Sequence, residues 1–161
     1  MDEKWRIKKS LHERYIGKVK INYGKIIKTG SQNLLPLTPI YKIIMKIYIG
    51  HSRNFDYKKE LYEPLKQSGL ANSHELIFPH ETDQVINSKN IIKNCDLMIA
   101  EVSFPATGLG IELGWANCFE RPIICIYKTG SKLSGSLKVV TDTFIEYSDN
   151  EELVNKLEEV L

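Results

Sequence analysis

The sequence predicts an α/β fold in which helices cover both faces of a parallel sheet, and three observations support this. From residue 45 onward, short β-rich segments alternate with segments of helical length. The segment 96–102 is almost continuously apolar, as strands buried on both faces of a parallel sheet are. Polar or glycine-rich loops follow the first and third predicted strands, where ligands bind in sheets of this kind.

The order of the elements follows from this alternation. We expect strands over 43–49, 75–78, 96–102, 122–127 and 144–147. We expect helices that begin at Asn54 or Asp56 and end near Gly69, that run over 82–94 and 109–119, and that run from an N-cap at Asp149 to the end of the chain. Right-handed crossovers give the strand order 2-1-3-4-5, a flavodoxin-like (Rossmann-like) three-layer sandwich with a five-stranded parallel sheet.

Composition narrows the class of protein. The 161 residues suit one compact domain, and a chain with 42% hydrophobic and 26% charged residues differs from a disordered one. No apolar run is long enough for a membrane span, so we expect no membrane partner. The three cysteines are sparse and odd in number, which indicates reduced thiols and predicts a cytoplasmic protein.

The first 44 residues differ from the rest in charge. Residues 1–44 hold 10 basic and 3 acidic residues, which leaves 12 basic and 17 acidic in residues 45–161. We interpret 1–44 as a basic N-terminal extension outside the native core, although 18–27 could form a short hairpin, and Met45 could itself be the start of the protein. Such segments can bind nucleic acid, but most are solvated tails, and we do not expect nucleic-acid binding.

In the predicted strand order, the loops 50–54 and 103–110 meet at the switch between strands 1 and 3. Glu112 falls in the expected first turn of the third helix, at the mouth of this crevice, although the helix dipole alone favours a glutamate there. Arg53 follows Gly50 in the first loop and would suit a phosphate group. His74 and His80 lack the spacing of a metal site, so we expect neither a metal nor a cofactor.

One longer pattern is more specific than a glycine loop. The segment 95–102, Pro105 and the motif Gly-x-Gly-x-Glu-Leu-Gly-x-Ala over 108–116 together resemble the nucleoside 2-deoxyribosyltransferase superfamily. Within it, the closer likeness is to 2′-deoxynucleoside 5′-phosphate N-hydrolases. The resemblance extends over about 46–138 and leaves the first 44 residues outside.

The resemblance implies roles for individual residues. Glu112 matches the nucleophile that attacks C1′ of the sugar, Tyr48 and Gly50 match the family's strand-1 tyrosine and glycine, and Arg53 matches a phosphate-binding arginine. Ser134 aligns with a serine that the neighbouring subunit supplies, which implies a homodimer with shared sites. The expected substrate-binding set is completed by His51, Ser52, Ser88, Thr107, Gly108 and Gly110.

Two positions depart from the family pattern. Ser88 stands where the family usually has a sugar-orienting aspartate. Ala106 stands where the hydrolases have a phosphate-binding serine and the transferases an aspartate, and Thr107 is a potential replacement. These departures leave the substrate open.

The resulting hypothesis is a hydrolase that cleaves the N-glycosidic bond of (deoxy)nucleoside 5′-monophosphates. A base-exchanging deoxyribosyltransferase is the near alternative, and Arg53 favours hydrolysis because a transferase needs no phosphate contact. A TIR-like NAD-cleaving or signalling module is a second class, suggested by residues 49–52. A catalytically silent nucleotide-binding protein is a third, suggested by Ser88.

Overall fold

The computed structural model describes residues 44–82 and 86–161, and the predicted extension 1–44 lies almost wholly outside this part of the chain. Five strands form one sheet in the order β2-β1-β3-β4-β5, and all four neighbouring pairs are parallel. The predicted fold class and strand order are therefore confirmed. The strands are β1 (Lys46–His51), β2 (Glu75–Ile77), β3 (Leu97–Glu101), β4 (Ile123–Lys128) and β5 (Phe144–Tyr147).

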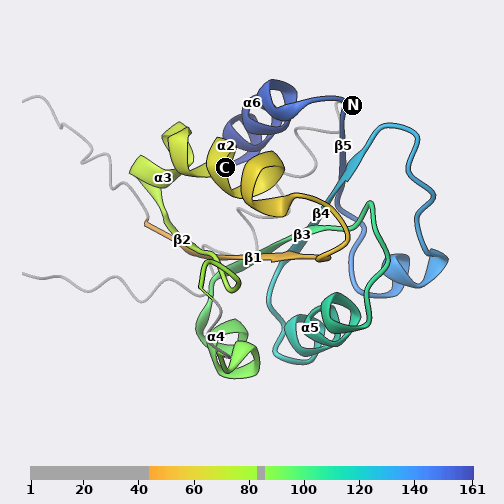
Figure 1. Cartoon of the computed structure of the whole chain (residues 1–161). Helices are drawn as coiled ribbons and strands as arrows, with labels where there is room; N and C mark the ends of the chain where they lie inside the picture. Colours follow the sequence, from red (N-terminus) through yellow and green to blue (C-terminus); the bar gives the residue numbers. More distant parts are fainter. Residues whose placement is uncertain (1–43, 83–85) are drawn as a thin grey trace, which may run out of the picture.

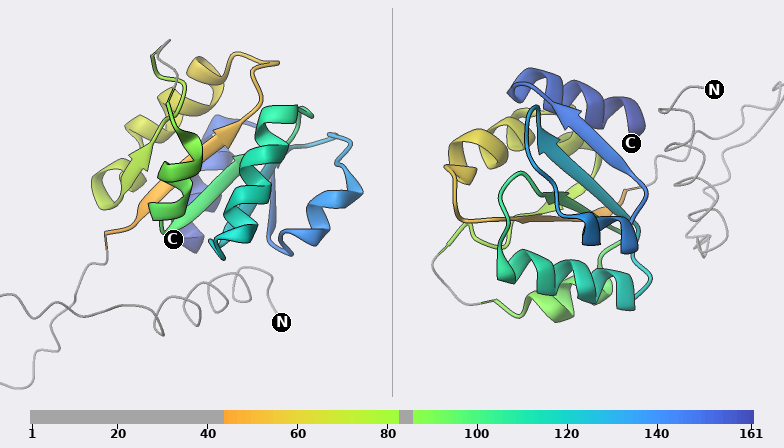
Figure 2. Two further views of the ribbon diagram at one scale, coloured as in Figure 1. Left: turned by 90° about the horizontal axis from the view of Figure 1, so that it is seen from below. Right: turned by 90° about the vertical axis from the view of Figure 1, so that its right-hand side faces the viewer.

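Helices cover both faces of the sheet (Figures 1 and 2). One layer holds η1 (Lys58–Tyr62), α2 (Glu63–Gln67), α3 (Gly69–Ser73) and α6 (Asn150–Val160). The other holds α4 (Ser88–Asn94) and α5 (Thr107–Cys118), and η2 (Gly135–Val139) follows β4. A separate apolar core fills the space between the sheet and each layer.

The alternation of side chains along β1 decides which residues reach which layer. Ile47 and Ile49 belong to the core under α2 and α6, whereas Tyr48 belongs to the core under α4 and α5. His51 follows the odd-numbered set, because it hydrogen-bonds Tyr62 of η1. Tyr48 and Gly50 therefore face α5, and His51 faces the opposite layer.

The first predicted helix differs from the observed one. Residues 58–73 form a π-helical turn and two short α-helices, and the chain is extended at Ser68 (ψ 164°). The Ser68 hydroxyl donates to the Leu65 carbonyl oxygen at 2.6 Å, and the Gly69 N–H donates to the Glu158 carboxylate of α6 at 2.7 Å. The predicted helix end near Gly69 agrees with the end of α2 at Gln67, but Gly69 also begins a further short helix, α3, which was not predicted.

The other helices correct the predicted boundaries. α4 begins at Ser88, with Asn87 as its N-cap, so the predicted start at 82 is too early. α5 begins at Thr107, two residues before the predicted start. The predicted cap of the last helix is confirmed, because the Asp149 carboxylate accepts a hydrogen bond from the Glu152 N–H at 2.9 Å. None of the described helices is long and apolar enough to span a membrane.

Candidate active site

A buried carboxylate lies at the carboxyl edge of the sheet, on the α4 and α5 side. The Tyr48 hydroxyl donates a hydrogen bond of 2.7 Å to Glu112 Oε1, which joins β1 to α5. The Ser88 hydroxyl at the start of α4 lies 3.1 Å from the same Tyr48 oxygen. Glu112 is 7% exposed and Tyr48 is fully buried. The sequence thus brings together three of its predicted site residues from three separate elements.

Gly50 lies beside this carboxylate, where neighbouring side chains leave no room for a Cβ atom. A methyl group at Gly50 would lie 3.5 Å from Glu112 Oε2, 3.1 Å from Leu109 Cδ1 and 2.5 Å from Met98 Cε. The last distance is shorter than real side-chain contacts, so a larger residue at this position would have to displace the Met98 side chain of β3. The glycine of the resemblance therefore has a steric reason to lie opposite Glu112.

The prediction that Glu112 lies in the first turn of α5 is wrong, because Glu112 is the sixth residue of that helix. The helix dipole acts mainly on the first turn, so it does not explain the ionisation of this carboxylate. Burial raises the pKa of Glu112, and hydrogen bonds from Tyr48 and Ser88 lower it. The charge therefore depends on these two hydroxyls.

The start of α5 lies within the predicted loop. Gly108 and Gly110 are inside the first turns of the helix, and the Gly110 N–H already donates to the Ala106 carbonyl oxygen at 3.0 Å. Ala106 is the N-cap and provides no side-chain hydrogen bond. Thr107, Gly108 and Gly110 are exposed, so the end of this helix can receive an anion through its first N–H groups.

The loops after β1, β2 and β3 meet at this edge. Arg53 Nη2 donates to His80 Nδ1 at 2.9 Å, which joins the loop after β1 to the segment after β2. Asn54 Nδ2 donates to the Pro105 carbonyl oxygen at 3.4 Å, which joins it to the loop after β3. The Arg53 guanidinium is exposed, at the same edge as Glu112.

His51 and Ser52 are turned away from Glu112. The His51 ring is buried, donates from Nδ1 to the Ser52 carbonyl oxygen at 2.7 Å and accepts from the Tyr62 hydroxyl at Nε2 at 2.6 Å. Burial lowers the pKa of His51 to about 4, so the ring is neutral near pH 7. The buried Ser52 hydroxyl accepts from the Asn54 N–H at 3.1 Å. This geometry does not support the prediction that His51 or Ser52 binds substrate.

Ser134 lies on the far side of β4. Its exposed hydroxyl is the N-cap of η2 and lies 2.7 Å from the Ser136 hydroxyl. It makes no described contact with Tyr48, Ser88 or Glu112 within the same chain. The predicted role of Ser134, which the resemblance assigns to a neighbouring subunit, stays a prediction.

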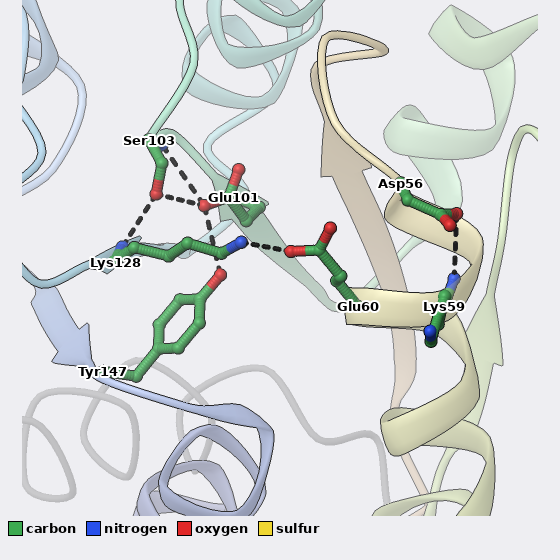
Figure 3. Close-up of polar contacts among 7 residues, drawn as sticks. All are labelled: Asp56, Lys59, Glu60, Glu101, Ser103, Lys128 and Tyr147. Atoms are coloured by element: carbon green, nitrogen blue, oxygen red, sulfur yellow. Dashed lines mark hydrogen bonds and ion pairs between the residues drawn. The ribbon is translucent and has the colours of Figure 1, made fainter.

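A second buried carboxylate, Glu101, lies on the opposite face of the sheet (Figure 3). Glu101 Oε1 accepts from the Tyr147 hydroxyl at 3.2 Å and from the Ser103 N–H and hydroxyl, whereas Oε2 has no partner. Lys128 donates its N–H to Ser103 at 2.7 Å and pairs with Glu60 through its ammonium group. Glu101 therefore fixes the exit of the chain from β3 and is directed away from Glu112.

Several residues of this edge were not predicted. Tyr62, His80 and Lys128 contact the loops around the site, and Phe55 stacks on Phe104 with ring centroids 5.2 Å apart. They come from different elements and share no local pattern. The acidic residue at the end of a continuous apolar strand, Glu101, was the one signal in the sequence that pointed to such a cluster.

Part of the chain is similar in sequence to curated nucleotide N-hydrolases. No family model matches the chain. The 5-hydroxymethyl-dUMP N-hydrolase of Rattus norvegicus is 32% identical over 82 residues, 50% of this chain and 45% of the relative. A putative 2′-deoxynucleoside 5′-phosphate N-hydrolase 1 of Syntrophotalea carbinolica is 34% identical over 73 residues, 44% of this chain and 51% of the relative.

The chain resembles nucleotide N-hydrolases. It spans about half the length of the curated relatives just named. Among solved structures, the CMP N-glycosidase of Clostridium botulinum superposes with a TM-score of 0.53 at 23% identity, over 70% of this chain and 98% of that one. The 2-deoxyribosyltransferase of Leishmania mexicana gives 0.53 at 15%, over 73% and 99%. The predicted resemblance to this superfamily is confirmed, and these neighbours share the fold.

The described residues contain no group of three histidine, cysteine or acidic side chains that could hold a metal ion. The polar groups that the structure places at the site are carboxylate, hydroxyl and guanidinium groups.

Proposed function

We propose that the protein is a hydrolase that cleaves the N-glycosidic bond of nucleoside 5′-monophosphates, with Glu112 as the nucleophile. The observation that carries this proposal is the buried Glu112 carboxylate, which accepts a hydrogen bond from Tyr48 at Oε1 and has Oε2 beside Gly50. A buried carboxylate with one oxygen held and the other beside a glycine suits attack on a sugar carbon. The similarity to nucleotide N-hydrolases supports the same reaction.

The reaction would proceed in two displacements. A Glu112 oxygen forms a bond to C1′ as the bond from C1′ to the base nitrogen breaks, and the base leaves with that electron pair and takes up a proton. Water then attacks C1′ and loses a proton, which balances the proton taken up by the base, the ester to Glu112 breaks with its electron pair returning to the carboxylate, and the products are free base and sugar 5′-phosphate. Two inversions give retention at C1′. Tyr48 donates to the carboxylate throughout and lowers the pKa of Glu112.

Arg53 and the start of α5 would bind the phosphate. The Arg53 guanidinium is held in place by His80 through one of its N–H groups, and the others can pair with a phosphate oxygen. The N-terminus of α5 adds backbone N–H groups at the same edge, with Thr107 in its first turn. These groups favour a monophosphate over a nucleoside.

We also propose that two copies of the chain share the site. Ile111 of α5 is 49% exposed and Val139 of η2 is 80% exposed, and both elements border the core beneath α5. A second subunit on this face would bury these apolar side chains and bring its Ser134 to the phosphate. Light scattering should give twice the chain mass, and Ile111→Glu should halve it, while a monomeric wild type would refute the shared site.

The test of the proposed reaction is release of free base from a panel of deoxy- and ribonucleoside monophosphates and their nucleosides. We expect release from monophosphates, with little from nucleosides. Base exchange with an added second base, at the expense of hydrolysis, would indicate a transferase. Cleavage of NAD alone would indicate the TIR-like class, and binding without turnover of any compound would indicate a silent binder.

A further inference from the structure

The hydroxyl of Tyr48 has a single proton and two oxygen neighbours. Glu112 Oε1 lies at 2.7 Å and Ser88 Oγ at 3.1 Å. An ionised carboxylate only accepts hydrogen bonds, whereas serine can donate or accept. All three groups are satisfied when Tyr48 donates to Glu112 and Ser88 donates to Tyr48.

We propose that Ser88 is a positioning residue, which directs the Tyr48 proton to Glu112 and thereby keeps the carboxylate in its nucleophilic, ionised form. This inference rests on the proposed role of Glu112. It gives Ser88 a function within the protein that differs from contact with the sugar. Ser88 acts through Tyr48, so removal of either hydroxyl should weaken the effect of the other.

The surroundings of Glu112 make this hydrogen-bond chain important. Among the described residues, the titratable groups that interact with Glu112 are Tyr48 of β1, which hydrogen-bonds it, and Tyr62 of η1 in the opposite layer. Burial raises the pKa of both phenols, so neither carries a charge at neutral pH. Burial also raises the pKa of Glu112 itself. The opposing influences that lower it are the hydrogen bonds of Tyr48 and Ser88. A change at Ser88, transmitted through Tyr48, should therefore appear in the ionisation of Glu112.

The backbone at Ser88 does not depend on its side chain. Asn87 caps α4, and its side-chain oxygen accepts from the Asn90 N–H at 3.2 Å. Ser88 itself is half-buried at the first position of the helix, where alanine is tolerated. Ser88→Ala should therefore fold, and Ser88→Thr keeps a hydroxyl at the same place.

The experiment is a carbon-13 NMR titration of protein labelled at the glutamate carboxyl carbons, with Glu112→Gln to assign the signal. Ser88→Ala should move the Glu112 midpoint to higher pH, Ser88→Thr should leave it near the wild-type value, and Tyr48→Phe should move it further upward. The shift in the double variant Tyr48→Phe/Ser88→Ala should be smaller than the sum of the single shifts. In an assay of base release, Ser88→Ala should lose about two- to tenfold on the acid limb, the factor of one hydrogen bond, and keep its plateau at higher pH.

Two results would overturn the proposal. An unchanged Glu112 midpoint in a folded Ser88→Ala protein would mean that Ser88 does not influence the carboxylate. Additive shifts in the double variant would mean that Ser88 does not act through Tyr48. The titration needs no substrate, so the expected shifts without turnover of any nucleotide would support the positioning role and refute the proposed reaction.

Discussion

Gly50→Ala separates the packing of this edge from its chemistry. The new methyl group would meet Met98 Cε at 2.5 Å and Leu109 Cδ1 at 3.1 Å, and both are ends of side chains that can shift. Overpacking of a core costs about 1–3 kcal/mol, and the flexible Met98 puts this site near the lower end. Alanine regains roughly 0.5–1 kcal/mol over glycine within a strand. We therefore expect a loss of about 0–2 kcal/mol in the free energy of unfolding, and a folded protein.

The effect on activity should be far larger. The methyl group would also lie 3.5 Å from Glu112 Oε2 and, in the proposed reaction, would crowd the sugar carbon that this carboxylate attacks. A displacement of about 1 Å from the attacking position can cost on the order of a hundredfold in rate, so we expect base release to fall by about that factor.

Ala100→Gly is the matched control for this variant. Ala100 pairs with Gly50 in the β1–β3 register, and its replacement costs roughly 0.5–1 kcal/mol without adding an atom near Glu112. Thermal melts and base release would be measured for both variants. Full activity in Gly50→Ala, or an equal loss in Ala100→Gly, would refute the steric argument.

Three further predictions concern other parts of the molecule. Arg53→Ala should weaken the binding of a nucleoside monophosphate, measured by calorimetry, at least tenfold more than that of the nucleoside, because a charge-assisted hydrogen bond contributes about 1.5–3 kcal/mol. Lys93→Ala, at the other end of α4, should change neither affinity. Equal losses of both affinities in Arg53→Ala would exclude phosphate binding by Arg53. Burial raises the pKa of Glu101, so its contribution to stability is present at low pH and lost as the pH rises through the folded-state pKa; denaturation of Glu101→Gln at several pH values should show a shallower decline than wild type, and parallel curves would contradict this. A chain that begins at Met45 should fold and keep its activity, and a lost melting transition would place residues 1–44 in the core.

The sheet could be predicted because each strand carries its own signal. The continuous apolar run of β3 requires burial on both faces, and the alternation of strands with helices fixes parallel crossovers. The short helix α3, which follows the end of α2 after one extended residue, could not be predicted in this way. Glycine commonly follows the end of a helix, but Gly69 also begins α3, where its N–H donates to the Glu158 carboxylate, 89 residues away in the sequence.

The functional site, too, could be predicted only in part from the sequence. Glu112, Tyr48 and Gly50 were selected through the resemblance, and the structure brings them into contact, while their roles stay predictions. The sequence pattern predicted that Glu112 lies in the first turn of its helix, where the helix dipole favours a glutamate. The helix starts at Thr107, five residues before Glu112, because the glycines are compatible with a helical backbone and the preceding Ala106 is extended. His51 looked available from its loop, but strand alternation turns it toward Tyr62.

The central claim is that Glu112 attacks the sugar, and Glu112→Gln tests it most directly. The amide has nearly the same size, can still accept from Tyr48 and has no charge to desolvate, so the variant should melt at or above the wild-type temperature. Glu101→Gln is the matched control, since it changes another buried glutamate on the opposite face. The account predicts that Glu112→Gln releases no base from any nucleoside monophosphate that the wild type cleaves, whereas Glu101→Gln still releases base. Undiminished hydrolysis by a folded Glu112→Gln protein would contradict it.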